Sequence, residues 1–300
     1  MCGLAGVILK DKSRSTSDLL GVRAGFESAL TNARVRGTHA TGYAKIDSSG
    51  KHEIVKRDLD ATNFVYGFGE YLKSISSIDK HTTVLMGHTR YATQGEPEIN
   101  RNNHPIRAGK TIGTHNGWVS NDDELFEHYN LERFAEVDSE VIFRMADDSD
   151  TVDEFVNNRF TKIRGRATIV WTDIERPEYV YLLKGNNPLE VAYNKKLELL
   201  VYGSTWDIIK DSFPSEDIER MVTKDNHLYR INTKTFKIRA TKVACNFSGL
   251  DRFLYKSPQK KTVYQNTVKR FVPVFTNKDR QEKLFKNVKA SDGSTIRRIK

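Results

Sequence analysis

The first residues of the chain could carry out nucleophilic catalysis. Cys2 follows Met1 directly, so removal of Met1 would place a thiol and a free α-amino group on one residue. Reference pKa values of about 8.5 for a thiol and about 7.7–8.0 for an α-amine would let the amine accept the thiol proton near neutral pH. A cysteine at this position is by itself more often a small apolar residue leading into a strand, so the hypothesis needs support from elsewhere.

Four further blocks supply that support because they occur in the order typical of one enzyme family. The opening MCGLAG is followed by RGTHATG at 36–42, GHTRYATQG at 87–95, THNG at 114–117 and DSEV at 138–141. Together the blocks resemble class II glutamine amidotransferases, whose catalytic domain is an N-terminal nucleophile hydrolase. The resemblance covers roughly residues 2–245 and points in particular to the glutaminase domains of glucosamine-6-phosphate synthase and amidophosphoribosyltransferase.

The resemblance implies a set of catalytic residues. Amide cleavage builds negative charge on the carbonyl oxygen, and one preorganised donor there is worth about 3–4 kcal/mol of barrier. The family gives this task to the side chain of Asn116 and the backbone N–H of Gly117, with Cys2 as nucleophile and Arg36 holding the N-terminal residue. Outside this context an Asn-Gly pair most often forms a hairpin turn, and Arg36 would be a solvated loop charge.

A second set of residues is implied for substrate binding. Free glutamine presents a carboxylate, which suits the planar fork of a guanidinium, and an ammonium, which suits a carboxylate. The matching positions are Arg90, assisted by Thr93, for the carboxylate and Asp138 for the ammonium, with Tyr91 beside them. The alternative for Asp138 is that it only caps a helix.

The chain departs from the family pattern at three positions. His39 stands where the family usually has Asp, Gln94 replaces His or Ala, and Tyr91 follows the purine-type enzymes rather than the sugar-type ones. His39 could be an additional acid or base because imidazole titrates near neutrality. The more common role for such a residue is structural hydrogen bonding.

Metal and cofactor sites are not indicated. His88, His104 and His115 lack the ligand-like spacing and the neighbouring Cys or carboxylate groups of a metal site. Cys245 lies in a β-rich stretch, where we expect it to be buried and inert. Residues 185–188 (GNNP) are interpreted as a turn, and neither a phosphate-binding loop nor a dinucleotide fingerprint is present.

Hydrophobic periodicity predicts the elements that must position these residues. Helices are expected at 17–34, capped by Ser17 or Asp18, and at 61–74, 122–129, 138–145 and 152–160. Strands are expected at 3–9, 43–46, 53–55, 82–91, 111–119, 167–171, 180–183, 189–193 and 199–202, with a hairpin over 229–243. This order favours an α+β fold. The resemblance specifies a four-layer αββα sandwich over residues 1–247, followed by a basic extension, 248–300.

Charge distinguishes the two predicted parts. Of the net charge of +9, residues 251–300 contribute +10, with 14 Lys and Arg against 4 Asp and Glu and six interspersed aromatics. Such a tail suits nucleic acid or an acidic partner, although solvated lysines or an arm docked on the body are equally good interpretations. No apolar stretch approaches the roughly 18–20 residues that a bilayer span needs, residues 4–9 are too short for a signal-peptide core, and two cysteines make no disulfide framework. We expect a cytoplasmic protein with no membrane contact.

The sequence thus predicts hydrolysis of L-glutamine to glutamate and ammonia through a γ-glutamyl thioester on Cys2. About 55 residues follow the glutaminase domain, too few for an acceptor domain, so ammonia is expected to pass to a separate synthase subunit. Two alternatives stay open: a hydrolase of the same fold acting on another γ-glutamyl amide, and a catalytically idle binding module whose tail holds nucleic acid.

Overall fold

The computed structural model describes residues 1–245 and 247, which lie within one compact unit. The predicted basic extension, 248–300, lies outside the described residues. The domain boundary placed at residue 247 therefore stays a prediction.

Seven antiparallel strands form the first sheet, in the order β11-β9-β10-β1-β4-β2-β3. Their bounds are β1 Gly3–Leu9, β2 Ala40–Asp47, β3 His52–Arg57, β4 Thr82–Arg90, β9 Glu190–Asn194, β10 Leu199–Gly203 and β11 Ile218–Met221. β1 occupies the centre between β10 and β4, and all seven of its residues are buried. The first strand of the chain is therefore fully buried, as are its neighbours β4 and β10.

Six antiparallel strands form the second sheet, in the order β13-β12-β8-β7-β6-β5. Their bounds are β5 Ile106–Ala108, β6 Thr111–Val119, β7 Gly165–Asp173, β8 Tyr179–Lys184, β12 His227–Asn232 and β13 Ile238–Lys242. β6 and β7 pair over their full nine-residue lengths, which fixes the register of residues 114–117.

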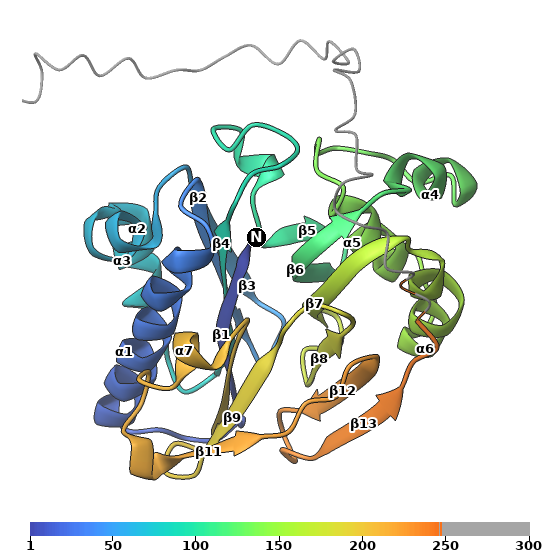
Figure 1. Ribbon diagram of the computed structural model, residues 1–300. Helices are drawn as coiled ribbons and strands as arrows, with labels where there is room; N and C mark the ends of the chain where they lie inside the picture. The colour runs from blue at the N-terminus through green and yellow to red at the C-terminus, as the bar shows by residue number, and fades with distance from the viewer. Residues whose placement is uncertain (246, 248–300) are drawn as a thin grey trace, which may run out of the picture. The chain divides into compact units, whose positions relative to one another are not determined.

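Helices cover the outer face of each sheet (Figure 1). The first sheet packs against α1 Thr16–Asn32, α2 Ala61–Gly67, α3 Gly69–Ile75 and α7 Trp206–Ile209. The second packs against α4 Asp122–His128, α5 Glu140–Asp147 and the segment in which α6 Val152–Glu154 continues as a π-helical turn, Phe155–Arg159. The predicted α+β, four-layer αββα sandwich is confirmed.

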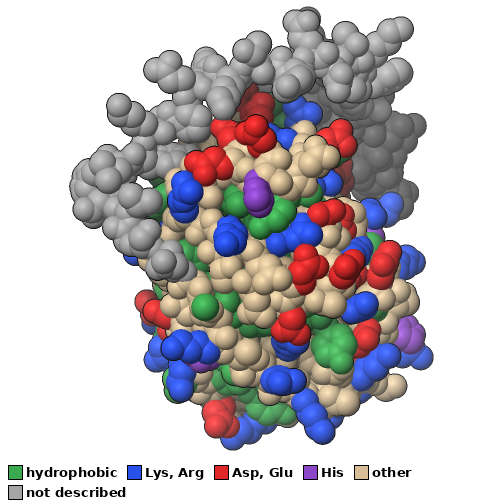
Figure 2. Space-filling model, turned by 90° about the vertical axis from the view of Figure 1, so that its right-hand side faces the viewer, with side chains coloured by type: hydrophobic (Ala, Val, Ile, Leu, Met, Phe, Trp, Pro, Cys, Tyr) green, Lys and Arg blue, Asp and Glu red, His purple; other side chains and the backbone are tan. Residues whose placement is uncertain are grey.

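One face of this unit carries charges of both signs. Lys and Arg side chains are interspersed with Asp and Glu side chains on the face that carries α4 and α6 (Figure 2). Among the described residues, none of the helices combines the length and the apolar character that crossing a membrane requires.

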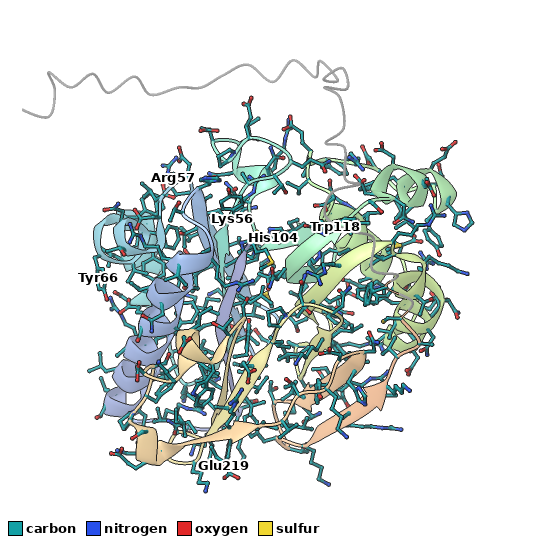
Figure 3. The ribbon with its side chains drawn as sticks, viewed as in Figure 1. Lys56, Arg57, Tyr66, His104, Trp118 and Glu219 are labelled. Atoms are coloured by element: carbon teal, nitrogen blue, oxygen red, sulfur yellow. The ribbon has the colours of Figure 1, made fainter. Side chains whose placement is uncertain are left out.

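The layer between the two sheets changes character from one end to the other. Alternate residues such as Leu4, Val84 and Ile112 point into it and form a fully buried apolar cluster. The same alternation places His88 and Asn116 in this layer near the end at which the chain starts. Figure 3 shows His104 between the sheets at that end and Glu219 on β11 at the other. The polar end is where the predicted site residues lie.

Several helix predictions were wrong in detail. The expected helix over 61–74 is two short helices separated at Phe68, whose ψ of 108° is extended. The cap of α1 is Ser15 rather than Ser17 or Asp18, because Ser15 and Asp18 form a reciprocal capping box. The helix expected from residue 138 begins at Glu140, and β5, β11 and α7 were not anticipated.

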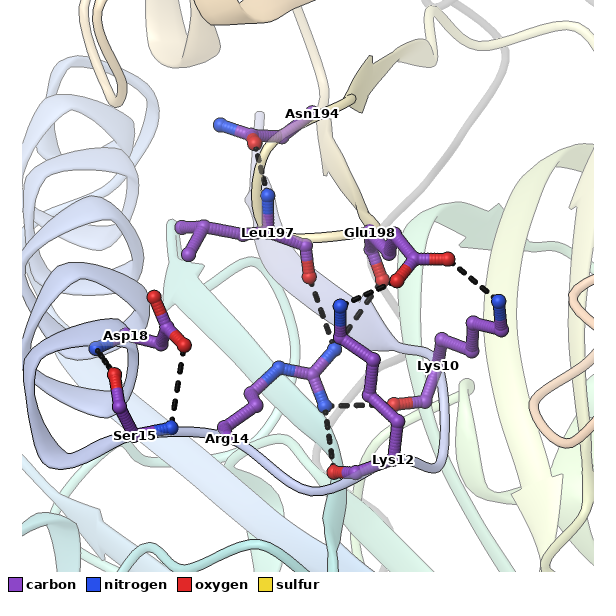
Figure 4. A network of polar contacts seen from close by, with 8 residues as sticks. All are labelled: Lys10, Lys12, Arg14, Ser15, Asp18, Asn194, Leu197 and Glu198. Atoms are coloured by element: carbon purple, nitrogen blue, oxygen red, sulfur yellow. Dashed lines mark hydrogen bonds and ion pairs between the residues drawn. The ribbon is translucent and has the colours of Figure 1, made fainter.

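A charged network fixes β1 at the end opposite Cys2 (Figure 4). The Glu198 carboxylate pairs with Lys10, which follows β1, and with Lys12. The Arg14 guanidinium donates to the carbonyls of Lys10 at 2.7 Å and Leu197 at 3.0 Å. These contacts join the exit of β1 to the β9–β10 turn, and the two lysines lower the pKa of Glu198 to about 2.

Replacing Glu198 with Gln tests this network. A carboxylate whose pKa is lowered on folding stabilises the protein above its ordinary value of 4.5 and loses that contribution as the pH falls towards about 2. Because the Glu198 side chain is 30% exposed, solvent screening limits the effect. We expect Glu198→Gln to lower the free energy of unfolding by up to about 1 kcal/mol at pH 7, measured by urea titration.

The difference between wild type and Glu198→Gln should shrink between pH 4.5 and 3. Glu219→Gln is the matched control. Glu219 pairs with Lys195, both side chains are largely exposed, and the pair should therefore contribute little to the free energy of unfolding. A difference for Glu198→Gln that stays constant from pH 7 to 3 would contradict the assignment.

Candidate active site

Cys2 stands directly before the central strand β1, which begins near the N mark in Figure 1. Gly3 allows this placement, because a Cβ there would come within 2.5 Å of Thr89 Oγ1 and 2.9 Å of the Ala33 carbonyl. The strand therefore packs tightly against β4 up to its first residue, and Cys2 follows from it at a fixed position.

The backbone of Tyr91 and the side chain of Arg36 hold Cys2. The Tyr91 N–H donates to Cys2 Sγ at 3.5 Å, and the Cys2 thiol donates to the Tyr91 carbonyl oxygen at 3.8 Å. Arg36 Nε donates to the Cys2 carbonyl at 2.9 Å, which is the contact expected of a residue that holds the N-terminal segment.

The electrostatics of Cys2 favour the thiol over the thiolate. Burial raises the pKa of the Cys2 thiol, although the Tyr91 N–H, the amino terminus and Arg90 act in the opposite direction. The sulfur therefore needs a base at neutral pH if it is to attack a carbonyl. The same interactions show that Cys2, Arg90 and Asp138 lie within electrostatic reach of one another.

Asn116 and Gly117 lie inside β6 rather than in a turn, so the hairpin alternative is wrong. Gly117 has φ +155°, and a Cβ there would lie 1.8 Å from the Arg166 carbonyl oxygen. Only glycine suits this paired but strained position. The missing side chain lets the Arg166 carbonyl and the His115 ring approach the backbone of residue 117.

Asn116 is buried and is connected to β1 by residues that the sequence did not reveal. Its Nδ2 donates to Ser204 Oγ at 3.4 Å, and the same Oγ accepts the Leu4 N–H at 2.8 Å. Asn187 Nδ2 donates to the Asn116 carbonyl at 2.8 Å. Ser204 thus joins the predicted oxyanion donor to the strand of the nucleophile, and Asn187 has a role beyond the turn assigned to residues 185–188.

Arg90 is buried and engaged by the loop that follows β4. Its Nη1 donates to Asn103 Oδ1 at 2.7 Å, and its Nη2 donates to the carbonyls of Gln94 and, at 2.7 Å, Gly95. Of the five N–H donors of a guanidinium, three are therefore directed at the protein. Tyr91 and Thr93 lie exposed on this loop, and the backbone of Tyr91 contacts Cys2 Sγ.

Asp138 does not cap a helix. Its Oδ2 accepts the Val119 N–H at 2.6 Å at the end of β6, and its Oδ1 accepts from Ser139 Oγ at 3.3 Å. Burial raises the pKa of Asp138 to about 6, assisted by the charge of Asp122. A buried carboxylate in this environment gains from a cationic partner.

Three histidines distant in sequence come together between the sheets. The rings of His88 and His104 stack at 4.3 Å, and His115 lies 6.5 Å from His104. Burial lowers the pKa of His88 to about 3 and of His115 to about 4, so both are neutral at physiological pH. In residues 1–245 and 247 no group of three His, Cys, Asp or Glu side chains is placed to hold a metal ion.

The remaining two residues of interest have local roles. His39 accepts the Ala92 N–H on Nδ1 at 2.9 Å, in agreement with a structural hydrogen-bonding function. Burial raises the pKa of Cys245 to about 12, as expected for an inert thiol, although the side chain is only partly buried.

Comparison with known proteins finds relatives of about two thirds of the chain. No protein-family model matches the chain. A probable glutamine–fructose-6-phosphate aminotransferase of Acanthamoeba polyphaga mimivirus is 26% identical over 204 residues, covering 65% of this chain and 31% of the viral protein. A 7-cyano-7-deazaguanine synthase of Saccharolobus solfataricus is 25% identical over 208 residues, covering 68% of this chain and 43% of the archaeal protein.

Solved structures agree on the fold. Glutamine phosphoribosylpyrophosphate amidotransferase from B. subtilis superimposes with a TM-score of 0.62 at 17% identity, over 82% of this chain and 50% of that enzyme. The resemblance to class II glutamine amidotransferases and the N-terminal nucleophile hydrolase fold are thereby confirmed. The chain spans about a third to two fifths of the length of these curated relatives.

Proposed function

We propose that this chain is the glutaminase of a class II glutamine amidotransferase, with Cys2 as its nucleophile. The observation that carries the proposal is the placement of Cys2 directly before the central strand β1, with its thiol against the Tyr91 backbone, while β1 is linked through Ser204 to Asn116. The homologous aminotransferases named for glutamine support the choice of amide donor.

Removal of Met1 supplies the base that the buried thiol needs. The freed α-amine of Cys2 takes the thiol proton, and the sulfur attacks the γ-carbonyl carbon of glutamine. Asn116 Nδ2 and the Gly117 N–H stabilise the oxyanion. The C–N bond then breaks, the α-ammonium returns its proton to the leaving nitrogen, and ammonia departs. Water, deprotonated by the same amine, hydrolyses the thioester and releases glutamate.

Substrate selection falls to the loop after β4 and to Asp138. Asp138 receives the substrate ammonium, and Arg90, with Thr93 and Tyr91, receives the carboxylate. Because Arg90 already binds the Gln94 and Gly95 carbonyls, carboxylate binding uses its remaining donors or displaces these carbonyls. This engagement favours one competing function, hydrolysis of a γ-glutamyl amide whose α-carboxylate is blocked, and turnover of the α-methyl ester of glutamine beside glutamine separates the two.

The released ammonia is proposed to pass to a separate synthase subunit. The matched part of each relative is less than half of a longer protein, and those proteins are named for aminotransferase or synthase reactions. The basic segment 251–300, with its charge of +10, is proposed to recruit that subunit or an acidic partner such as nucleic acid. The proposed location is cytoplasmic.

Removal of the nucleophile tests the proposal. Cys2→Ala should abolish release of glutamate from glutamine, and Asn116→Ala should lower kcat by about 10²–10³ through loss of an oxyanion donor, measured by a coupled glutamate assay. Cys245→Ala is the matched control, since it removes the other thiol and should leave the rate unchanged. Wild-type turnover by Cys2→Ala would refute the proposal.

The raised pKa of Asp138 predicts that glutamine binds more weakly at acidic pH. Because burial raises its pKa to about 6, the carboxylate becomes neutral below that pH and loses its attraction for the glutamine ammonium. The KM for glutamine should therefore rise by about tenfold per pH unit below pH 6, while Asp138→Asn should show a high KM with no such slope. A KM that stays flat from pH 7 to 5 in the wild type would contradict this role.

A further inference from the structure

The His39 side chain extends the pairing of β2 and β4 beyond the last residues of the strands. Ala40 and Arg90 are the final pair of this ladder, and the His39 N–H donates to the Arg90 carbonyl at 3.0 Å. Two residues beyond Arg90, the Ala92 N–H donates to His39 Nδ1 at 2.9 Å. The imidazole thus takes the place of a backbone carbonyl where the sheet has ended.

The ring of His39 makes a second contact with the same loop. It stacks on Tyr91 with 5.0 Å between ring centroids and 28° between planes. Tyr91 is 50% exposed and lacks the packing that would otherwise fix a loop residue. The His39 side chain therefore restrains two residues: it stacks on the ring of Tyr91 and accepts the N–H of Ala92.

The restrained segment is the one that touches the nucleophile. The Tyr91 N–H and carbonyl, on the two peptide units that flank Tyr91 Cα, are both directed at Cys2 Sγ, at 3.5 and 3.8 Å. Rotation of the Tyr91 backbone would move donor and acceptor away from the sulfur together. The peptide unit that carries the Ala92 N–H also carries the Tyr91 carbonyl, so the bond to Nδ1 sets its orientation.

We propose that His39 is a positioning residue for Cys2, acting through the Tyr91–Ala92 segment. Nδ1 must lack a proton to accept from Ala92, so the ring proton resides on Nε2. His39 itself touches neither the sulfur nor the predicted oxyanion donors. The inference relies on the proposed function only in taking Cys2 as the nucleophile.

Two substitutions separate the acceptor of His39 from its ring. His39→Phe keeps an aromatic ring against Tyr91 and removes the acceptor, whereas His39→Asn keeps an acceptor near the place of Nδ1 and removes the ring. His39 is exposed, so neither change buries new surface. The groups that act on the thiol, namely Arg90, Asp138 and the amino terminus, are unaltered in both variants. Thermal unfolding verifies the fold, and His39→Ala serves as a second acceptor-free variant.

The pH dependence of Cys2 alkylation by iodoacetamide, in a Cys245→Ala background, reports directly on the Tyr91 contact. The Tyr91 N–H stabilises the thiolate, so its displacement should raise the alkylation midpoint by about 0.5–1 pH unit in His39→Phe and His39→Ala. The kcat for glutamine should fall by about tenfold in the same variants. His39→Asn should recover most of both quantities.

Unchanged midpoints in His39→Phe and His39→Ala would overturn the proposal. Equal losses in His39→Phe and His39→Asn would overturn the assignment to Nδ1. Because alkylation needs no substrate, the midpoints still decide the role of His39 if the wild type fails to hydrolyse glutamine, an outcome that would reject the proposed function alone.

Discussion

The contact between the Tyr91 backbone and the Cys2 sulfur is the interaction on which the arrangement of the site depends. It exists because β1 and β4 are neighbours in the centre of the first sheet, so the residue before one strand meets the residue after the other. Arg36 fixes the carbonyl of Cys2, and Arg90 orders the loop beyond Tyr91 through the Gln94 and Gly95 carbonyls. Arg36 and Arg90 thus restrain the backbone at Cys2 itself and at the loop that begins with Tyr91.

Burial sets the chemistry of the site. Transfer of an ionisable group away from water disfavours its charged form, and this raises the pKa values of Cys2 and Asp138 and lowers those of His88 and His115. Near neutral pH His88 and His115 act as neutral hydrogen-bonding groups, and the thiol keeps its proton. A thiol that keeps its proton requires a nearby base before it can act as a nucleophile, and the proposed removal of Met1 would supply one as the α-amine of Cys2.

Whether the sequence could predict a feature of the site depends on how far apart in the chain the interacting residues lie. Periodicity predicted strand β1, whereas the αββα layers and the grouping of Cys2 with Arg90 and Asp138 were implied by the resemblance of the ordered motifs to an enzyme family. Local sequence patterns gave the wrong alternative where contacts distant in sequence decide the structure. Asn116 and Gly117 are paired within strand β6 and do not form a turn. Asp138 accepts a hydrogen bond from the Val119 N–H and does not cap a helix. Ser204 and Asn187 reach Asn116 across 88 and 71 residues, and no local pattern encodes such contacts. The stack of His39 on Tyr91 likewise needs the β2–β4 register.

The central claim is that Cys2 becomes covalently acylated during turnover. Intact-mass measurement of protein quenched in acid while it hydrolyses glutamine, followed by peptide mapping, tests it most directly. The expected result is loss of Met1 and a mass increase of one γ-glutamyl group on the peptide that begins with Cys2. Steady turnover with Met1 retained, or an adduct on any other residue, would contradict the claim.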